Sequence, residues 1–405
     1  MISTERVRSV AGVISSVEVL SDDGAFADLE REWDKLLEAS DQRVFFLRWS
    51  WNRHWWENFK PPGSRLYLVT CRDDYGRLVA LAPFYWKPRR TLGIPHVRDL
   101  CFLGTGVYAQ TSEYLNIIVR GGYEKQAASA LVQFLRGRAD WDRLWLREIP
   151  STSTVHSEMM TALGDSAVLA PCNRSHFIDT TVNWETFVES LSRSTRKHLK
   201  RQMRKFNEKY RCRFGRVESE DALDPALDAL VRLHQARWQS KDEPGSFVIP
   251  GFESLVRDAA RSALPAGRLR LWTLELDGKV AAVRLAFLDN EIVHAIQGGF
   301  DPDYAKDSLG SVMLGMCIKD CIDDPDVRAY DFMGGTDTYK DWWTKLGNET
   351  VTMTYVRPGI RGYLYQAILT MTRVIKPVLR RLMPADIRMA LHRWMVRRRM
   401  GPQSM

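Results

Sequence analysis

The sequence predicts an α/β (α+β) protein with two similar units, each a mixed, twisted sheet flanked by helices, and a short basic helical tail. An internal repeat is the first observation behind this prediction. Residues 65–80 read RLYLVTCRDDYGRLVA, and residues 268–281 read RLRLWTLELDGKVA. The second observation is a shared order of elements around each repeat, and the third is a strongly basic C-terminal segment.

Each repeat has the pattern of a β-hairpin. Both copies begin RLxLxT, continue into a short turn containing Asp and Gly, and then start an apolar strand. Helical periodicity precedes each hairpin, and a further strand, a helix and a last strand follow it. We expect this helix and last strand at 127–135 and 143–148, and again at 312–322 and 327–333. The sequence therefore predicts domains at 14–180 and 181–358.

The predicted tail spans residues 359–405. Its apolar spacing is typical of helix and is interrupted by Pro377 and Pro384, so we expect two short helices. Ten Lys or Arg stand against the single Asp386, a local net charge of +9 that accounts for the +8 of the chain. Two interpretations stay open: peripheral contact with an anionic inner membrane, or a helix packed on the protein with its arginines in water.

The composition is that of a globular protein. The chain has 405 residues, of which 45% are hydrophobic and 11% aromatic, enough for two packed cores. The opening MISTERVRSV has no apolar core typical of a signal peptide, and no apolar run is long enough to span a bilayer. The six cysteines lack CxxC or metal-ligand spacing, so we expect free thiols, no metal and a cytoplasmic location.

A second cationic block lies at 193–213, where ten Lys or Arg accompany the single Glu208. One apolar stripe at helical spacing runs through it and consists of Leu199, Met203, Phe206 and Tyr210. Its cationic face is either simply solvated or attracts an anionic substrate such as a nucleotide sugar, a polyanionic glycan or the phosphates of CoA. We expect no specific DNA binding, because no reader motif accompanies the charge.

The segment DPDYAKDSLGSVMLGM, at 301–316, changes abruptly from a polar loop into an apolar helix. The first turn of a helix has unpaired N–H groups and about half a positive charge. Ser308 or Ser311 could cap some of these groups, and Gly310 would let a ligand approach the backbone. A phosphate suits such a site. The alternative is an ordinary capped helix in which Gly310 serves a turn.

A third informative segment is YDFMGGTDTYKDWW, at 330–343. It predicts a buried strand end, a tight Gly334–Gly335 turn and a polar Tyr339–Lys340 pair. Lys340 could hold a substrate carboxylate or phosphate, with Asp331 to orient it, or could form a salt bridge between the two halves.

The tryptophans fall into two groups. Trp51 and Trp55 share a helical stripe with Phe59, which predicts core packing. Aromatic faces can also stack on sugars, and the residues left for the substrate side are Trp238, Trp342 and Trp343.

Four runs of the second half resemble the GNAT superfamily of acyltransferases. They are HQARWQ (234–239), RLRLWTLELDGKVAAVRLAF (268–287), GGFDPDYAKDSLGSVML (298–314) and YDFMGGTDTYKDWW (330–343). More narrowly they resemble the CelD/BcsL-like branch, which is associated with cellulose and exopolysaccharide biosynthesis. The first half is similar to that branch's N-terminal unit, so the resemblance covers about 14–350. It implies tandem GNAT-like units, the first degenerate and the second competent for acyl-CoA.

The resemblance implies acetyl-CoA or another acyl-CoA as co-substrate. Its pyrophosphate would lie on the helix start, and its thioester beside the preceding strand, here 291–298. The cofactor-binding residues that follow are Gln297, Gly298, Ser308, Leu309, Gly310, Ser311 and Val312. Relatives often have Ser-Pro-Gly where this chain has Ser308-Leu309-Gly310, so the fixed φ of proline is absent.

Acyl transfer needs a base for the acceptor, N–H donors for the thioester carbonyl and an acid for the departing thiolate. Tyr304 and Tyr339 are candidate acids, and Asp301, His234 and Asp331 are candidate bases. Each also has an ordinary structural interpretation, as a buried tyrosine, a helix residue or a turn former. The candidate substrate-binding residues are Lys340, Arg237, Trp238 and Arg196.

The leading hypothesis is a cytoplasmic acyltransferase that transfers an acyl group, in the first instance acetyl, to a sugar precursor or related small metabolite. A second hypothesis is a FemABX-like transferase that uses aminoacyl-tRNA, for which the 193–213 helix would suit the RNA. A third is a noncatalytic partner in a polysaccharide synthesis complex.

Overall fold

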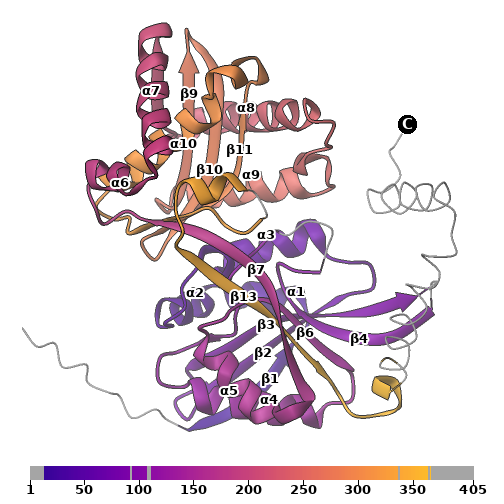
Figure 1. The fold of residues 1–405 in the computed structure, drawn as a ribbon. Coiled ribbons are helices and arrows are strands. Elements are labelled where there is room, and N and C mark those ends of the chain that lie inside the picture. The colour runs from indigo at the N-terminus through magenta and orange to yellow at the C-terminus, as the bar shows by residue number, and fades with distance from the viewer. Residues whose placement is uncertain (1–12, 92–93, 107–110, 336–337, 364, 366–405) are drawn as a thin grey trace, which may run out of the picture. The chain divides into compact units, whose positions relative to one another are not determined.

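The structure is a computed structural model, and it describes residues 13–365 except 92–93, 107–110, 336–337 and 364. The chain divides into two compact units (Figure 1). The first comprises the residues up to Gln42, Phe46–Cys172 and the chain from Thr350 onward. The second comprises Arg43–Phe45 and Asn173–Glu349.

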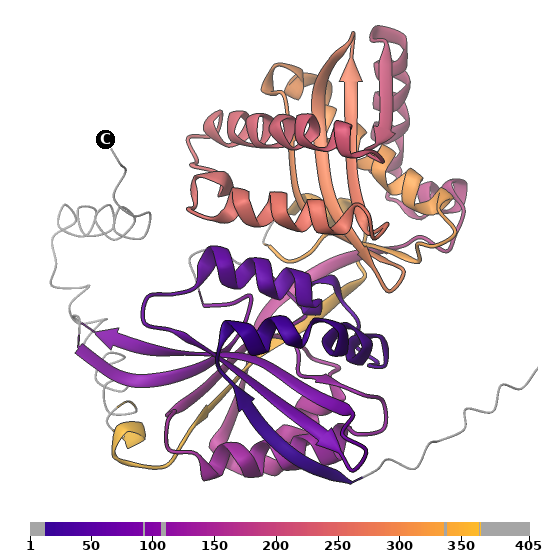
Figure 2. The same cartoon turned by 180° about the vertical axis from the view of Figure 1, so that it is seen from behind.

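The first unit is built on a sheet with strand order β1-β2-β3-β4-β6-β13. Its elements are β1 (Ile14–Leu20), α1 (Asp23–Asp28), α2 (Glu30–Glu38), α3 (Trp49–Phe59), β2 (Arg65–Asp73), β3 (Leu78–Thr91), β4 (Ile94–Phe102), β5 (Ile118–Val119), α4 (Glu124–Gly137), β6 (Arg143–Pro150), α5 (Thr154–Leu163), the first part of β7 (Ala167–Asp179) and most of β13 (Gly347–Val356). The β4–β6 pair is parallel and the other pairs are antiparallel. β2 and β3 are largely buried, because α2 contacts β3 while α4 contacts β1 and β2 (Figure 2).

Indole groups form much of the core of this unit. Trp33, Trp51 and Trp55 are each at most 1% exposed. Trp33 Nε1 donates to the carbonyl of Leu47 at 2.7 Å, and Trp51 Nε1 donates to Ser112 Oγ at 2.8 Å. These partners satisfy the polar edge of two rings that are otherwise surrounded by apolar atoms. The prediction that Trp51 and Trp55 pack in a core is confirmed.

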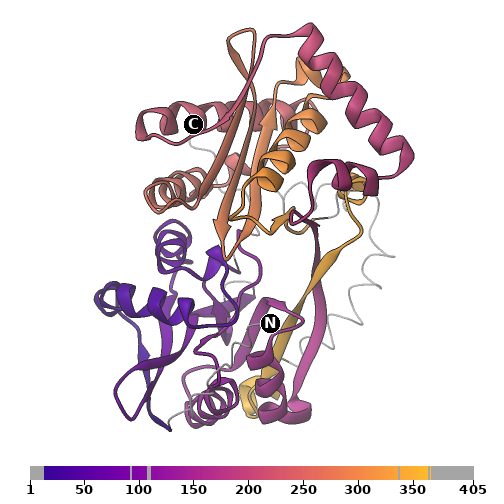
Figure 3. The ribbon, with the colours of Figure 1, turned by 90° about the vertical axis from the view of Figure 1, so that its left-hand side faces the viewer.

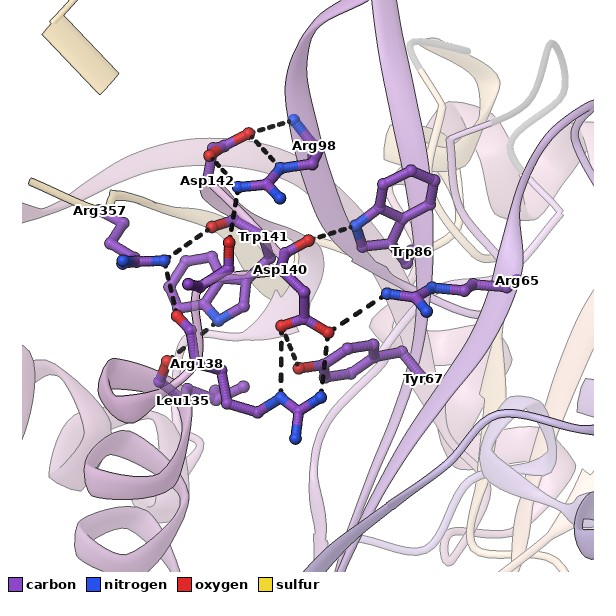
Figure 4. A network of polar contacts seen from close by, with 11 residues as sticks. Arg65, Tyr67, Trp86, Arg98, Leu135, Arg138, Asp140, Trp141, Asp142 and Arg357 are labelled. Carbon is purple, nitrogen blue, oxygen red and sulfur yellow. Dashed lines mark hydrogen bonds and ion pairs between the residues drawn. The ribbon is translucent and has the colours of Figure 1, made fainter. Parts of the chain in front are cut away.

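An ion-pair network fixes the turn between α4 and β6 (Figure 4). Arg98 on β4 donates to both oxygens of Asp142, at 2.8 and 2.7 Å, and Asp140 accepts from Tyr67 and Arg138, both at 3.1 Å. Burial opposes the charge of Asp142, but the hydrogen bonds from Arg98 outweigh it and lower the pKa of this carboxyl. The network therefore joins β2, β4 and the turn, and its charged groups have a structural role.

The second unit has three layers (Figure 3). Its sheet has the order β7-β12-β11-β10-β9-β8, with β11 and β12 parallel and the other described pairs antiparallel. α8 and α9 cover one face of the sheet, and α6, α7 and α10 cover the other. The elements are α6 (Trp184–Ser190), α7 (Arg193–Lys209), β8 (Cys212–Arg216), α8 (Glu220–Gln239), α9 (Phe252–Ala263), β9 (Leu269–Leu276), β10 (Lys279–Asp289), β11 (Ile292–Phe300), α10 (Leu309–Asp323) and β12 (Ala329–Asp331), with 3-10 helices η3 (Ser246–Val248), η4 (Pro302–Asp307) and η5 (Thr338–Trp342).

The predicted fold class is confirmed, and so are its main elements. Both hairpins form, as β2–β3 and β9–β10. The apolar 312–322 pattern lies within α10, and the cationic block forms α7, with Leu199 and Phe206 of its predicted stripe buried. The helical tail expected at 359–405 lies, from residue 366 on, outside the described residues.

The chain passes between the units along two strands. β7 leaves the first unit at Cys172, and β13 returns to it at Thr350. The domain limits expected at 180 and 358 differ from these passages. The difference arises because β13 pairs with β6, from Thr350 opposite Pro150 to Val356 opposite Arg143, and so completes the first sheet.

Several features bear on the compartment and metal predictions. No helix in the described ranges has both the length and the apolar character that a membrane crossing requires. The same residues contain no cluster of three or more His, Cys, Asp or Glu side chains suited to a metal ion. The six cysteines are free.

Candidate functional site

The β11–α10–β12 segment forms an opening at one end of the second sheet. β11 pairs with β10 along its whole length, but with β12 only from Ile292 opposite Ala329 to His294 opposite Asp331. β12 ends there while β11 continues to Phe300. In the described chain, the far half of β11 therefore has no strand on that edge. A β-bulge also shifts the register of β11 beside Gln297, and such a bulge changes the direction of the neighbouring side chains.

The start of α10 follows this free edge of β11. Ser308 has φ 64°, and its carbonyl accepts from the amides of Ser311 at 2.9 Å and Val312 at 3.1 Å. The amides of Leu309 and Gly310 have no acceptor among the described residues. The capping expected from Ser308 is not observed, because its hydroxyl accepts from Gln202 Nε2 at 3.1 Å instead. Two backbone donors at the positive end of α10 therefore fit an anion.

Gly310 also serves packing. A Cβ at this position would lie 2.9 Å from Cε1 of Phe300. Its missing side chain therefore lets α10 pack closely on the end of β11. The predicted role, close approach of a ligand, concerns the backbone N–H and stays a prediction.

The basic helix α7 lies beside the same helix start. Lys209 Nζ and Lys205 Nζ donate to Asp307 at 2.7 and 2.9 Å, and the Tyr210 hydroxyl donates to it at 2.9 Å. The hydrogen bonds of Lys209, Lys205 and Tyr210 hold the pKa of the Asp307 carboxyl well below its usual range. Part of the cationic face of α7 is thus paired with a carboxylate instead of being simply solvated. The sequence predicts the cationic helix, but it does not indicate that Lys205 and Lys209 share Asp307 as their partner.

His234 lies on α8, across the sheet from α10, and is 2% exposed. Its Nε2 accepts from the Ser246 amide at 3.1 Å, so the proton is on Nδ1, which donates to the carbonyl of Gly298 at 3.2 Å. Burial lowers the pKa of this imidazole to about 4, against a smaller opposite effect of the Gly298 bond. A role as base would require one of these bonds to break.

Arg237 and Trp238 lie on the same helix. The guanidinium carbon of Arg237 is 5.0 Å from the Phe300 ring centroid and 5.9 Å from that of Trp238. Arg196 is on α7, on the opposite face of the sheet, and donates to the carbonyl of Glu189 at 3.4 Å. Of the four predicted substrate residues, the structure therefore brings Arg237 and Trp238 together and places Arg196 on the other face of the sheet.

Asp331 and Lys340 support the turn after β12. The Asp331 carboxylate accepts from the Met333 amide at 2.6 Å. Lys340 Nζ donates to the carbonyls of Met333 at 2.8 Å and Gly334 at 2.6 Å. Both side chains are buried, with 2% exposure. Lys340 forms no salt bridge with a described residue, so that alternative is not observed, and its carbonyl partners explain how a lysine is buried here.

Three candidate acids and bases remain: Asp301 and Tyr304 lie at η4, and Tyr339 lies on η5. Asp301 caps η4 by accepting from the Asp303 amide at 3.0 Å. Tyr304 is half-buried, edge-on to Tyr210 with ring centroids 5.5 Å apart, and burial raises the pKa of its phenol. Tyr339 is half-buried, edge-on to Phe332 at 6.4 Å.

A pocket of about 1060 Å³ lies between α6, α7 and the segment that contains η5. Trp342, which is 61% exposed, and Trp343 line it together with His198, Asp341 and Lys345. The rest of the lining consists of Ile178, Asp179, Val182, Thr186, Phe187, Ser190, Leu191, Ser192, Ser194, Thr195, Thr344 and Leu346. The pocket is therefore mainly apolar and aromatic, with charged groups, hydroxyls and a wide mouth for a substrate-sized molecule.

Comparison with known families identifies the segment around this geometry. Residues 193–341 match the family model described as "Acetyltransferase (GNAT) domain". This segment is a GNAT acetyltransferase domain. The opening of β11, the start of α10 and α7 all belong to the GNAT domain, whereas β7, α6 and part of the pocket precede or follow it. Among curated proteins, none matches the chain.

Solved structures that are similar to most of the chain have the same architecture. The crystal structure of FemX has a TM-score of 0.60 at 10% identity, with 87% of this chain and 100% of that chain covered. The C-terminal domain of a putative lysylphosphatidylglycerol synthetase from Agrobacterium fabrum has a TM-score of 0.51 at 10% identity, covering 86% and 97%. At this identity the similarity shows the fold alone, a mixed α/β arrangement that extends beyond the GNAT domain.

Proposed function

We propose that the GNAT domain transfers an acyl group, in the first instance acetyl, from acyl-CoA to a sugar precursor or related small metabolite. The amides of Leu309 and Gly310, which have no acceptor in the described part of the chain, carry this proposal together with the free edge of β11. They would hold the donor's diphosphate, since two N–H groups and the helix dipole converge there. The free edge of β11 would accept the donor's extended arm through backbone hydrogen bonds. Bound in this way, the donor supplies an activated thioester.

The pocket between α6, α7 and η5 would receive the acceptor. Its exposed Trp342 offers an aromatic face of the kind that stacks on a sugar, and Asp179, Asp341 and Lys345 offer polar partners. These features support the predicted sugar-linked acceptor. The proposed role in polysaccharide biosynthesis, of the CelD/BcsL-like kind, rests on the resemblance of the sequence alone. The acid and base would come from Tyr304, Tyr339, Asp301 or Asp331, which lie around the opening and on the turn after β12.

Substitution of Ser311 by Asp tests the donor site without loss of a core contact. A carboxylate in the first turn of α10 favours the helix dipole, so the protein should stay folded and equally or slightly more stable. The same charge should repel a diphosphate and weaken acetyl-CoA binding about tenfold or more in isothermal titration. Ser157→Asp, near the start of α5, adds the same charge and should leave binding unchanged. Equal affinity in S311D and the unaltered protein would exclude this site.

A second candidate function is transfer from aminoacyl-tRNA. The structural similarity to FemX, which covers 87% of this chain, and the cationic α7 favour it. Nuclease treatment of purified protein separates the two candidates. Acetyl-CoA binding by nucleic-acid-free protein supports the first, whereas copurifying RNA and no acetyl-CoA binding support the second. Folded protein that binds neither would support the noncatalytic role.

A further inference from the structure

Arg284 reaches across the sheet of the GNAT domain. It lies on β10, opposite Gly298 of β11, and its Nε donates to the Tyr330 hydroxyl on β12. The guanidinium carbon is 5.7 Å from the centroid of the Tyr330 ring. A Cβ on Gly298 would lie 3.6 Å from Nη1 of Arg284, so the side chain crosses β11 where that strand has no side chain. The guanidinium is thus held beside the free edge of β11, on the face that α10 covers.

The charge of Arg284 has no counter-ion among the described residues. Its hydrogen-bond partner is a phenol whose pKa burial raises, so Tyr330 stays neutral. The most deeply buried arginines of the chain differ in this respect. Arg143 pairs with Asp99 at 2.5 Å, Arg48 pairs with Glu38 at 2.7 Å, and Arg270 pairs with Asp324 at 3.3 Å. A half-buried guanidinium without a carboxylate is costly, which suggests that a ligand supplies the missing charge.

The free atoms of Arg284 define the chemistry of that ligand. Nε is used by Tyr330, while Nη1 and Nη2 have no acceptor in the described structure. The two terminal nitrogens of a guanidinium match the two oxygens of a carboxylate. The position beside Gln297 and Gly298 is also where the proposed function puts the thioester. A bound carboxylate would therefore lie within a few bonds of the reacting carbon.

We propose that Arg284 binds a carboxylate of the substrate and thereby selects which molecules this site accepts. The inference rests on the proposed acyltransfer function and narrows its substrate class. The carboxylate has two possible sources: the far end of a dicarboxylic acyl group on the donor, or an amino-acid acceptor. Either source would place a planar anion against Nη1 and Nη2.

The first experiment tests the carboxylate site without acyl transfer. Succinate should raise the melting temperature of the unaltered full-length protein, whereas uncharged succinamide should not. In Arg284→Gln, which keeps a donor for Tyr330, the succinate effect should disappear, and Arg284→Lys should retain only part of it. Arg213→Gln, which removes an 84% exposed arginine of the same domain, should behave like the unaltered protein. A succinate effect that is equal in R284Q, or absent from the unaltered protein, would overturn the proposal.

The second experiment separates the two sources. If the donor carries the carboxylate, succinyl-CoA should bind about tenfold or more tightly than acetyl-CoA, and R284Q should abolish that ratio. If the acceptor carries it, amino acids but not their amides should stimulate thiol release from acetyl-CoA, and R284Q should lose this preference. Failure of both acyl-CoA esters to bind would refute the proposed function, while the succinate result would still decide the role of Arg284. If acyl-CoA binds but the protein prefers neither succinyl-CoA nor amino acids, the proposed role of Arg284 is refuted while the proposed acyltransfer function still stands.

Discussion

Lys209 Nζ lies 2.7 Å from Asp307 Oδ2, and this ion pair joins the basic helix α7 to the residue that precedes the αL turn into α10. Lys205 donates to the other oxygen of the same carboxylate at 2.9 Å. Asp307 is thus an internal anion next to the proposed phosphate site. It engages two lysines that could otherwise contact a bound diphosphate.

Replacement of Asp307 by Asn should therefore strengthen acetyl-CoA binding about three- to tenfold, because a nearby negative charge is removed and two cations are released. The free energy of unfolding should change little, since both lysine side chains are about half exposed and solvent screens their ion pairs. Isothermal titration and urea unfolding measure the two quantities. Asp303→Asn, with the same charge change on η4, serves as the control. Weaker binding in D307N would mean that Asp307 orders the site instead of competing with the donor.

His234 should make the second unit sensitive to acid. Its pKa is about 4 when folded, below the ordinary 6.5, so stability is complete above pH 6.5 and falls as the pH drops towards 4. The expected loss at pH 5, relative to pH 7, is about 2 kcal/mol from this group. His234→Gln cannot titrate, so its unfolding free energy should depend less on pH by about that amount. Urea unfolding at the two pH values tests this, with His198→Gln as the control. An unchanged pH difference in H234Q would contradict the assignment.

Gly299 should tolerate no side chain. A Cβ there would lie 2.2 Å from the backbone nitrogen of His234, which is where α8 packs on β11. Gly299→Ala should therefore lower the free energy of unfolding by about 3 kcal/mol, because neither backbone can move easily. Gly215→Ala on β8 places its Cβ in open space and should change stability by about 0.5 kcal/mol or less. Equal stability of the two variants would show that α8 yields at this contact.

Much of the fold was predictable because local patterns determine it. The hairpins at 65–80 and 268–281, the apolar stripe of α7 and the core position of Trp51 each follow from the spacing of nearby residues. The pairing of β13 with β6 was not predictable in this way, since it joins residues about 200 positions apart with no shared motif. The observed passages between the units fall at Cys172 and Thr350, whereas the sequence predicts domain limits at 180 and 358.

The candidate site shows the same division. The helix start at Ser308 was visible in the sequence as a change from polar to apolar residues, and a lone arginine within VAAVRLAF could have pointed to Arg284. The partners of Asp307, the tautomer of His234 and the carbonyl contacts of Lys340 were not visible. They depend on side chains from separate elements meeting in space, which no periodicity reports. The functional roles predicted for these residues stay predictions.

The pairing of β13 with β6 has a consequence for biosynthesis. Everything from Asn173 to Glu349 is synthesised before the strand that completes the sheet of the first unit. On the ribosome, one edge of β6 therefore stays unpaired with β13 while the second unit emerges and folds as an insert. A chain that ends before Thr350 would therefore contain the complete second unit attached to a first unit that lacks an edge strand.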